Sequence, residues 1–279
     1  MTAHATELRT VEAVLSYHGS ASERPVTYTY EPPPGTPRRS GTLIERIARI
    51  HDARPLRDGL SLDQQGFALV DHESVVGDFF DPAAIKAVYY PEIERLVGAA
   101  TGGRVLAFDH NLRSAPRMAR GESGIKEPVR RVHNDFTALS GWRRARDELA
   151  AAGEDADTLQ KQRFAIINAW RPIGGPVHES PLAVCDARTI APQDLVAGDL
   201  VYRDRVGETY AVTFSPQHRW YYAPTMQPTE VLLIKCFDSW EHGPARFTAH
   251  SAFDDPTSPA NAPARQSIEV RTLVLYRPH

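Results

Sequence analysis

Residues 131–135 contain a histidine and an aspartate two positions apart, His133 and Asp135. On an extended strand, alternate side chains project from the same face, so this imidazole and this carboxylate point in one direction. Together they supply two of the three ligands of a facial triad, which holds Fe(II) through two histidines and one carboxylate and leaves its other positions open. The motif is short, and the alternative interpretation is the ordinary end of a surface strand.

A facial triad needs a second histidine from a later strand, and the sequence offers His250 and His218. They lie 117 and 85 residues after His133. Arg265 follows His250 by 15 residues, which allows one turn and a return on the neighbouring strand, whereas 47 residues separate it from His218. The spacing therefore favours His250 as the third ligand. His218 remains the alternative, or else lines the pocket or is a structural histidine beside the aromatic residues 220–222.

The start of the last predicted strand carries a candidate carboxylate-binding pair, Arg265 and Ser267. Their side chains share one strand face. A guanidinium binds a carboxylate through two parallel hydrogen bonds, so Arg265 is suited to the distal carboxylate of a cosubstrate.

The order of His-x-Asp, a distal histidine and Arg-x-Ser resembles the Fe(II)/2-oxoglutarate-dependent dioxygenases. Within them, the chain is similar to the CmcJ/AsaB-like hydroxylase and desaturase family, which resembles the fungal gibberellin desaturase and occurs in secondary-metabolite clusters. The resemblance covers about residues 104–278 and is most specific in the segments 218–226, 230–239, 245–253 and 265–271.

This resemblance implies a double-stranded β-helix that uses Fe(II), 2-oxoglutarate and O2 to hydroxylate or desaturate a small molecule. It implies that the three candidate ligands hold the iron and that Arg265 and Ser267 bind 2-oxoglutarate. The chain departs from the wider pattern at two points: the gap from His250 to Arg265 is a few residues longer, and a further arginine, Arg271, lies on the same strand. Arg271 is therefore the alternative clamp for 2-oxoglutarate.

Two other functions stay open at the level of sequence. A jelly roll with the same metal ligands could act as a cupin-like dioxygenase or isomerase that does not use 2-oxoglutarate. Alternatively, the chain is a non-catalytic jelly-roll binding domain whose histidines are structural.

Three polar residues lie within apolar runs and are candidates for ligand contact. Arg171 ends the apolar run 164–172, where an unpaired charge is costly to bury. It either binds a substrate or cosubstrate carboxylate inside the barrel, or forms an ion pair with Asp186 or Asp199. Lys235, inside the apolar run 231–237, raises the same question as Arg171. Asn168 either binds a polar group of the substrate or bonds to backbone.

The C-terminal part of the chain is predicted to be mainly β, with flanking helices. Short apolar runs bounded by Gly, Pro, Asp or Ser are typical of a β-sandwich, jelly roll or barrel, and not of alternating βαβ units. We expect a double-stranded β-helix of the jelly-roll or cupin-like type. The predicted strands are 164–170, 182–185, 199–202, 210–214, 220–222, 230–237, 246–253 and 268–276.

The chain is interpreted as one continuous domain in two parts. Residues 1–103 form an N-terminal extension with helices that pack on the core, and residues 104–279 form the catalytic core. A helical insertion at about 140–163 has polar residues on most sides, which predicts a mobile lid. In the first part, strands are expected at 26–30 and 67–70. A helix is expected to begin at Asp81 and Pro82, to be interrupted at Pro91, and to end at Gly102.

Composition limits the range of partners. The chain has 279 residues and a net charge of -3, so no overall basic field favours nucleic acid or anionic lipid, and a small-molecule substrate is expected. Cys185 and Cys236 lie 51 positions apart without a CxxC pair, which argues against a disulfide framework and favours a reducing cytoplasm. The chain contains no run of 18 apolar residues, so a membrane span is not expected. No feature points to a particular oligomeric state.

Overall fold

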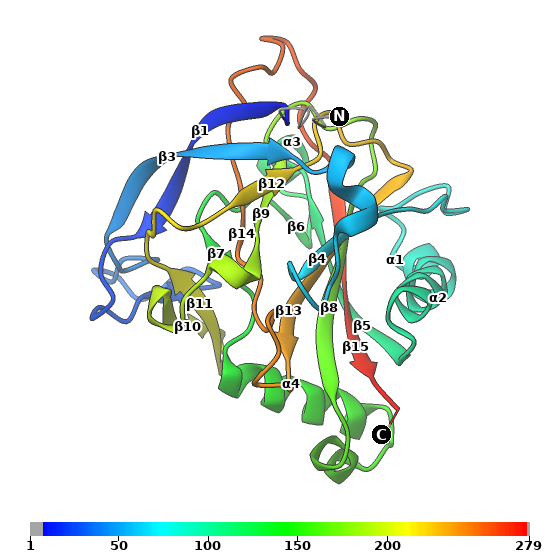
Figure 1. Ribbon diagram of the computed structural model, residues 1–279. Coiled ribbons are helices and arrows are strands. Elements are labelled where there is room, and N and C mark those ends of the chain that lie inside the picture. Colours follow the sequence, from blue (N-terminus) through cyan, green and yellow to red (C-terminus); the bar gives the residue numbers. More distant parts are fainter. Residues whose placement is uncertain (1–7, 278–279) are drawn as a thin grey trace, which may run out of the picture.

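Two β-sheets face each other in the computed structural model, which describes residues 8–277 (Figure 1). Sheet A contains, in spatial order, β1 (Thr10–His18), β3 (Leu43–Asp52), β12 (Trp220–Tyr222), β9 (Leu182–Cys185), β14 (His250–Ala252), β7 (His133–Asn134), β11 (Val206–Val212), β10 (Leu195–Val201) and β2 (Val26–Tyr28). Sheet B contains, in spatial order, β4 (Phe67–Asp71), β13 (Glu230–Asp238), β8 (Phe164–Pro172), β15 (Ser267–Leu275), β5 (Arg104–Arg113) and β6 (Ile125–Lys126).

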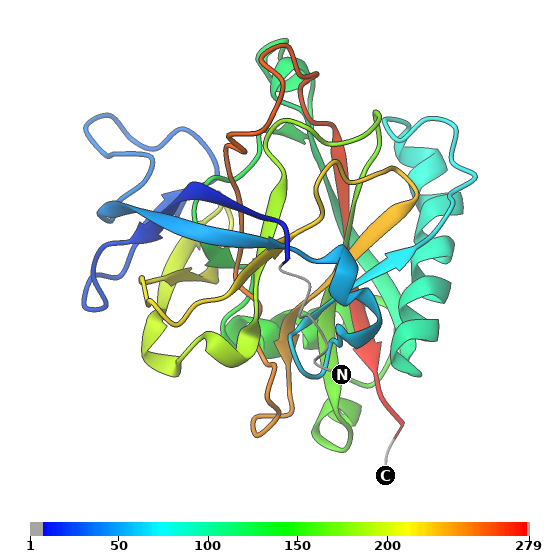
Figure 2. The ribbon, with the colours of Figure 1, turned by 45° about the horizontal axis from the view of Figure 1, so that its top comes forward.

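Helices are few and lie around the sheets (Figure 2). They are α1 (Pro82–Ala84), a π-helical segment (Ile85–Tyr89), α2 (Tyr90–Thr101), α3 (Ala115–Ala119) and α4 (Ala138–Ala151), with 3-10 turns at Arg54–Gly59, Ala156–Gln160, Ala187–Thr189 and Pro192–Asp194. Within residues 8–277, no helix is both long enough and apolar enough to cross a lipid bilayer.

The predicted mainly β, jelly-roll class is confirmed. The eight strands expected after residue 163 are present as β8 to β15, with ends that differ by a few residues. The largest difference concerns β14, because only His250–Ala252 of the expected 246–253 pairs with neighbouring strands.

β8 shows how the two sheets are joined to the rest of the fold, since all nine of its residues are buried. Phe164 and Ile166 enter the hydrophobic core between the sheets. Ala165 and Ile167 point the other way, toward the helical segment on the outer face of sheet B. A strand that is buried on both faces carries an unbroken apolar run, which explains the sequence pattern at 164–170.

The helical segment before β5 forms as predicted. The Asp81 side chain accepts a hydrogen bond from the amide two residues later, and Pro82 occupies the first helical position. Gly102 ends α2 in the left-handed region at φ 70°. The interruption expected at Pro91 is present as the π-helical segment Ile85–Tyr89, which directly precedes α2.

The first hundred residues contribute more strand than the sequence predicts. They supply β1, β2 and β3 to sheet A and β4 to sheet B, so they build the sheets as well as pack on them. β1 buries Val11, Ala13 and Leu15 in a separate core on the outer face of sheet A. β3 was not predicted, because most of its residues are exposed or half-exposed on both faces and its sequence lacks the alternation of apolar and polar residues that marks a strand.

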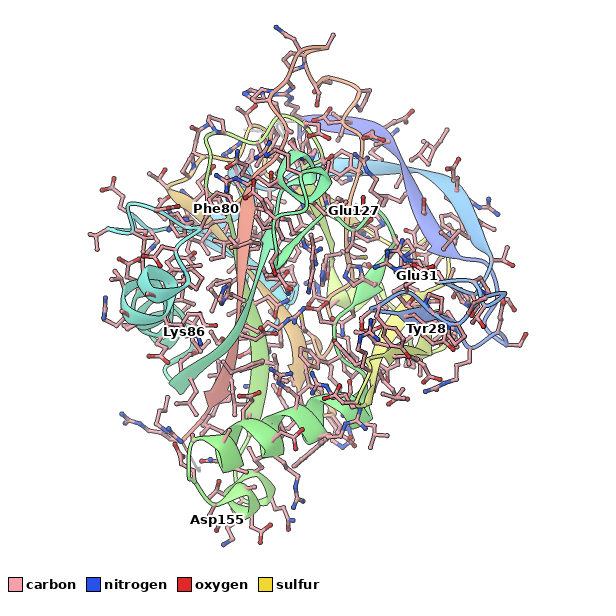
Figure 3. All side chains as sticks on the ribbon, turned by 180° about the vertical axis from the view of Figure 1, so that it is seen from behind. Tyr28, Glu31, Phe80, Lys86, Glu127 and Asp155 are labelled. Carbon is pink, nitrogen blue, oxygen red and sulfur yellow. The ribbon has the colours of Figure 1, made fainter. Side chains whose placement is uncertain are left out.

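The prediction of a mobile lid at 140–163 is wrong. α4 places Ala145 and Leu149 in the core between the sheets. A capping box fixes its start, since the Thr137 hydroxyl accepts from the Ser140 amide and the Ser140 hydroxyl accepts from the Thr137 amide. The helix closes the lower end of the barrel in Figure 1, and Asp155, which follows it, lies at the lower tip in Figure 3. Most of the residues that α4 buries are small, so its sequence shows no strong apolar stripe although the helix packs on the core.

Because α4 packs closely on β13, replacing Gly141 of this helix with alanine should destabilise the protein, although alanine usually stabilises a helix. A Cβ added to Gly141 would lie 2.2 Å from Cδ2 of Phe237. Alanine normally stabilises a helix interior by about 1 kcal/mol relative to glycine. Here we expect Gly141→Ala to lower the free energy of unfolding by about 1–3 kcal/mol in urea, because the core is overpacked.

Gly98 in α2 is the matched control, since an added Cβ there finds its nearest atom at 3.5 Å. We expect Gly98→Ala to raise the free energy of unfolding by up to about 1 kcal/mol. Stabilisation by both substitutions would contradict the packing of α4 on Phe237.

Candidate metal centre

The three candidate iron ligands meet on the inner side of sheet A. β7 and β14 are neighbours, and their register places His250 directly opposite His133, with ring centroids 4.4 Å apart. Asp135 Oδ1 lies 3.6 Å from Nε2 of His133 and 3.9 Å from Nε2 of His250. One ligand atom from each of the three groups lies within 4.8 Å of the others. Within residues 8–277, no other trio of His, Cys, Asp or Glu side chains meets this criterion.

Hydrogen bonds orient both imidazoles toward this cluster. Nδ1 of His133 lies 2.8 Å from the carbonyl oxygen of Arg131, and Nδ1 of His250 lies 3.1 Å from that of Thr248. A carbonyl oxygen only accepts, so each Nδ1 carries the proton and donates it. Each Nε2 therefore keeps a lone pair that faces Asp135, which is the arrangement found in histidines that bind metals.

The residue between the first two ligands anchors this segment to sheet B. Asn134 is fully buried, and its Nδ2 donates to the carbonyl oxygens of Phe136 at 2.7 Å and Cys236 at 2.8 Å. β7 is only two residues long, so these bonds and its pairing with β11 and β14 determine where the ligands stand.

The protonation states of the cluster suit a cation. Burial raises the pKa of Asp135, but its neighbours, with the charge of Arg271 first among them, lower it more, so this pKa lies well below its usual range. Burial and the neighbouring His133 lower the pKa of His250. At neutral pH the cluster therefore presents a carboxylate and an unprotonated imidazole, the forms that bind metal ions.

Asp135 is held by side chains from sheet B. The register of β8, β15 and β5 places Asn168, Arg271 and Asp109 side by side on the inner face. Arg271 donates to Asp135 Oδ2 from Nη2 at 3.0 Å, and its Nη1 donates to Asp109 Oδ2 at 3.0 Å. Asn168 Nδ2 donates to Asp135 Oδ2 at 2.8 Å. Burial lowers the pKa of Arg271, but Asp135, Glu269 and Asp109 raise it above its ordinary value.

Two residues that the sequence singled out bond to other side chains of the chain. The Asn168 side-chain amide donates to the Asp135 carboxylate, a contact that the sequence analysis did not predict. Arg271, the alternative clamp for 2-oxoglutarate, has its guanidinium engaged by carboxylates of the chain itself.

Arg265 has the opposite environment. It is buried next to the face of Trp170, with its Cζ 5.4 Å from the ring centroid, and it donates to the carbonyl oxygen of Ser180. Its Nε and the hydroxyl of Ser267 are buried without hydrogen-bond partners. Burial, followed by the charge of Arg113, lowers the pKa of Arg265 to about 9. A buried guanidinium and hydroxyl with unused donors fit an incoming anion.

Arg171 is not in the barrel, which corrects its predicted role. It lies on the opposite face of β8 from Asn168, near the rings of Phe79 and Tyr89, and it donates to the carbonyl oxygen of Pro228. The ion pairs considered for it are also absent from residues 8–277, because Asp186 pairs with Arg188 and Asp199 with Arg24. One position along a strand reverses the face, so an arginine three residues after Asn168 points to the helical side.

Lys235 and His218 both contact other side chains of the chain. Lys235 is fully buried and donates to Asp63 at 2.6 Å and Asp238 at 2.7 Å. His218 stacks on Tyr17, and its Nε2 lies 3.2 Å from Asp194 Oδ2. His218 is outside the His133, Asp135 and His250 cluster, so the alternative third ligand is not brought to it.

Sequence patterns missed two acidic residues near the cluster. Asp109 binds Arg271, and Glu269 Oε1 lies 3.4 Å from Arg271 Nη2. The available signal was the alternation of polar residues at 109, 111 and 113, which share the inner face of β5. The apolar run 105–108 ends at Phe108, whereas β5 continues to Arg113, so the polar half of this strand is not visible as an apolar pattern.

The three ligands differ in their exposure to solvent. The side chain of His133 is 19% exposed, that of Asp135 is 10% exposed and that of His250 is 3% exposed. His133 on β7 is therefore the most accessible of the three ligands, and His250 on β14 lies deepest.

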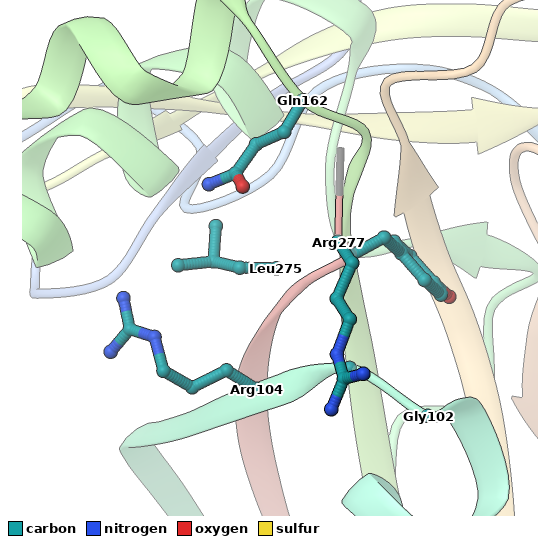
Figure 4. A pocket seen from close by; sticks show the side chains of 7 residues that line it. Gly102, Arg104, Gln162, Leu275 and Arg277 are labelled. Carbon is teal, nitrogen blue, oxygen red and sulfur yellow. The ribbon is translucent and has the colours of Figure 1, made fainter. Parts of the chain in front are cut away.

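A surface pocket lies at the other end of β15 from Arg265 (Figure 4). Arg104, Gln162, Leu275 and Arg277 are among the residues that line its ≈ 340 Å³. Arg104 is paired with Glu154, and none of the three clustered ligands contributes to this pocket. The His133, Asp135 and His250 cluster is therefore separate from this pocket.

Comparison with known proteins gives a consistent result. The family model described as "Oxidoreductase/YMDC permease-like domain" matches residues 15–275. The Fe(II)/2-oxoglutarate-dependent dioxygenase nvfI of Aspergillus novofumigatus is 36% identical over 259 residues, covering 88% of this chain and 89% of the relative. The hydroxylase/desaturase efuI of Hormonema carpetanum is 36% identical over 250 residues, covering 81% and 82%. The solved structure of the iron and alpha-ketoglutarate-dependent endoperoxidase NvfI superimposes with a TM-score of 0.85 and 31% identity, covering 95% and 98%.

Replacing the buried cations Lys235 and Arg265 should affect the free energy of unfolding differently. Lys235→Met should lower the free energy of unfolding by about 1–3 kcal/mol, because it removes one of the two cations, Lys235 and Arg163, that bond to the buried carboxylate of Asp238. Arg265→Met should change it by less than about 1 kcal/mol, or raise it, because the lost guanidinium has no carboxylate partner among its hydrogen bonds.

Urea unfolding of the ligand-free protein measures both effects. A loss of several kcal/mol with Arg265→Met would mean that this guanidinium is structural and not held ready for an anion.

Proposed function

This chain belongs to the hydroxylase/desaturase family of Fe(II)/2-oxoglutarate-dependent dioxygenases, and on that premise we propose that His133, Asp135 and His250 hold its iron. The chain is an oxidoreductase whose cofactors are Fe(II), 2-oxoglutarate and O2. The family resemblance seen in the sequence is thereby confirmed.

The observation that carries the proposal is the convergence of two Nε2 lone pairs and one carboxylate oxygen on a single point. The donor set, two imidazoles and one carboxylate, is the one preferred by non-haem Fe(II) enzymes that activate oxygen. The backbone bonds of both Nδ1 atoms hold the imidazoles in the tautomer that coordination needs.

Arg265 and Ser267 fit the distal carboxylate of 2-oxoglutarate. Both are buried and both have unused hydrogen-bonding capacity. Ser267 begins β15, the strand that also carries Arg271, and Arg265 lies two residues before it. The bidentate bond between a guanidinium and a carboxylate would satisfy the free Nε and compensate the buried charge. Arg271 is less suited, because Asp135, Asp109 and Glu269 already surround it. This difference favours the use of 2-oxoglutarate over a cupin-like reaction without it.

The chemistry that the bound iron and 2-oxoglutarate supply is the activation of O2 for removal of hydrogen from a C–H bond of the substrate. The protein contributes position and exclusion of water. We place the approach of substrate on the side of His133, the most exposed of the three ligands, while the packed core between the sheets excludes water behind the cluster. The enzyme acts on a small molecule, by hydroxylation or desaturation.

The proposal extends to the metabolic context and the cellular location of the enzyme. We place the reaction in secondary metabolism, as the names of the relatives suggest for those proteins. A cytoplasmic location is supported by Cys185 and Cys236, which are both buried free thiols.

The ligand assignment predicts which histidine binds iron. His250→Ala should weaken anaerobic Fe(II) binding by at least about 100-fold, because even the outer partners of metal ligands are worth about 10–100-fold. His218→Ala should bind Fe(II) as the wild type does. Equilibrium titration with Fe(II) alone measures this, and succinate formation from 2-oxoglutarate provides a second measurement. Loss of iron with His218→Ala and retention with His250→Ala would overturn the assignment.

The cosubstrate assignment predicts an effect that separates from iron binding. Arg265→Gln should weaken 2-oxoglutarate binding to the iron-loaded protein by about 30-fold or more, because losing a buried charge partner costs about 2 kcal/mol or more. Its Fe(II) affinity should stay within about twofold of the wild type, since Arg265 is not bonded to any of the three ligands. Wild-type affinity for 2-oxoglutarate in this variant contradicts the assignment.

A further inference from the structure

The two oxygens of the Asp135 carboxylate have separate environments. Oδ2 accepts three hydrogen bonds: from Asn168 Nδ2 at 2.8 Å, from Arg271 Nη2 at 3.0 Å and from Arg271 Nε at 3.2 Å. Oδ1 instead faces the Nε2 atoms of His133 and His250, at 3.6 and 3.9 Å. The carboxylate is thus committed to donors of sheet B through one oxygen and to the metal centre through the other.

This separation bears on how many positions a bound metal keeps free. A facial triad in which each residue contributes one atom leaves three of six positions open. If both oxygens of Asp135 coordinated, only two positions would remain. Coordination through both oxygens would therefore leave fewer positions for the cosubstrate and O2.

We propose that Arg271 and Asn168 are positioning residues that restrict Asp135 to coordination through Oδ1 alone. The inference rests on the proposed function, since it concerns the same metal centre, and it assigns these two side chains a task that neither cosubstrate nor substrate binding accounts for. Withdrawing Oδ2 would require breaking three charge-assisted or amide hydrogen bonds in a buried site.

Arg271 is itself immobilised, so it is a rigid support. Its Nη1 donates to Asp109 at 3.0 Å, and its Nη2 lies 3.4 Å from Glu269. Asp109 lies 4.0 Å from Arg144 of α4, whose Nε is 2.6 Å from Glu148. A chain of ion pairs therefore leads from the packed helix to the second oxygen of Asp135. Such outer-sphere partners typically contribute about 10–100-fold to metal affinity.

The test uses the full-length protein and Co(II) alone, a divalent probe whose visible absorption reports the number and geometry of its ligands. Arg271→Gln should weaken Co(II) binding by about 10–100-fold, because the Asp135 carboxylate loses the side chain that holds it in place. It should also change the visible spectrum, because Oδ2 becomes free to join the metal. Arg271→Lys keeps the charge but loses the fork, and should lie between Arg271→Gln and the wild type. Asn168→Ser removes a single donor and should shift affinity and spectrum in the same direction as Arg271→Gln, by a smaller amount.

Arg104→Gln is the matched control. Arg104 lies on β5, next to β15, and is half-exposed and paired with Glu154, away from the metal centre. This variant should retain wild-type Co(II) affinity and spectrum. Circular dichroism and melting curves establish that each variant folds, and Asn168→Ser with Arg271→Lys decides the outcome if Arg271→Gln does not.

The possible outcomes are distinct. Co(II) affinity within about twofold of the wild type and an unchanged spectrum in the Arg271 and Asn168 variants would overturn the inference and leave the proposed function standing. Loss of 2-oxoglutarate affinity with unchanged Co(II) binding in Arg271→Gln would overturn it in favour of Arg271 as the clamp. Absence of stoichiometric Co(II) binding by the wild type would overturn the proposed function itself.

Discussion

The buried carboxylate of Asp135 is the charge around which the inner face of sheet B is organised. A carboxylate removed from water needs opposite charge and hydrogen bonds, or it becomes protonated. Arg271 and Asn168 supply both to one oxygen, and the two imidazoles face the other. Arg271 in turn needs the acidic groups of Asp109 and Glu269. The polar residues on three adjacent strands are therefore consequences of one buried charge.

Two arginines of the same strand region show how environment separates roles. Arg271 is surrounded by carboxylates, and its charge is used within the protein. Arg265 is equally buried but has no carboxylate among its side-chain hydrogen bonds, and its Nε is unsatisfied. Binding sites often carry such a cost in stability, because a group that is ready for a ligand is not satisfied without it. Residue type alone does not distinguish the two, whereas the identity of their neighbours does.

The fold supports this site from several directions. β7 has only two residues, so its place depends on β11, β14 and the amide of Asn134. The π-helical and α-helical segment packs on the outer face of sheet B, and α4 closes one end of the core between the sheets. The strands of the N-terminal part extend both sheets and cover the outer face of sheet A. The ligands thus stand on a short strand that a large surrounding structure keeps in register.

Local periodicity was sufficient for the His-x-Asp pair, for most strands of the core and for the helix that starts at Asp81, because these features depend on residues close in sequence. Tertiary structure decided the rest. His250 is the histidine that meets His133, because strand register between distant segments selects it. Arg171 lies on the outer, helical face of β8. Alternation along a strand separates its two faces, but β8 is buried on both, so the sequence does not identify the inner one.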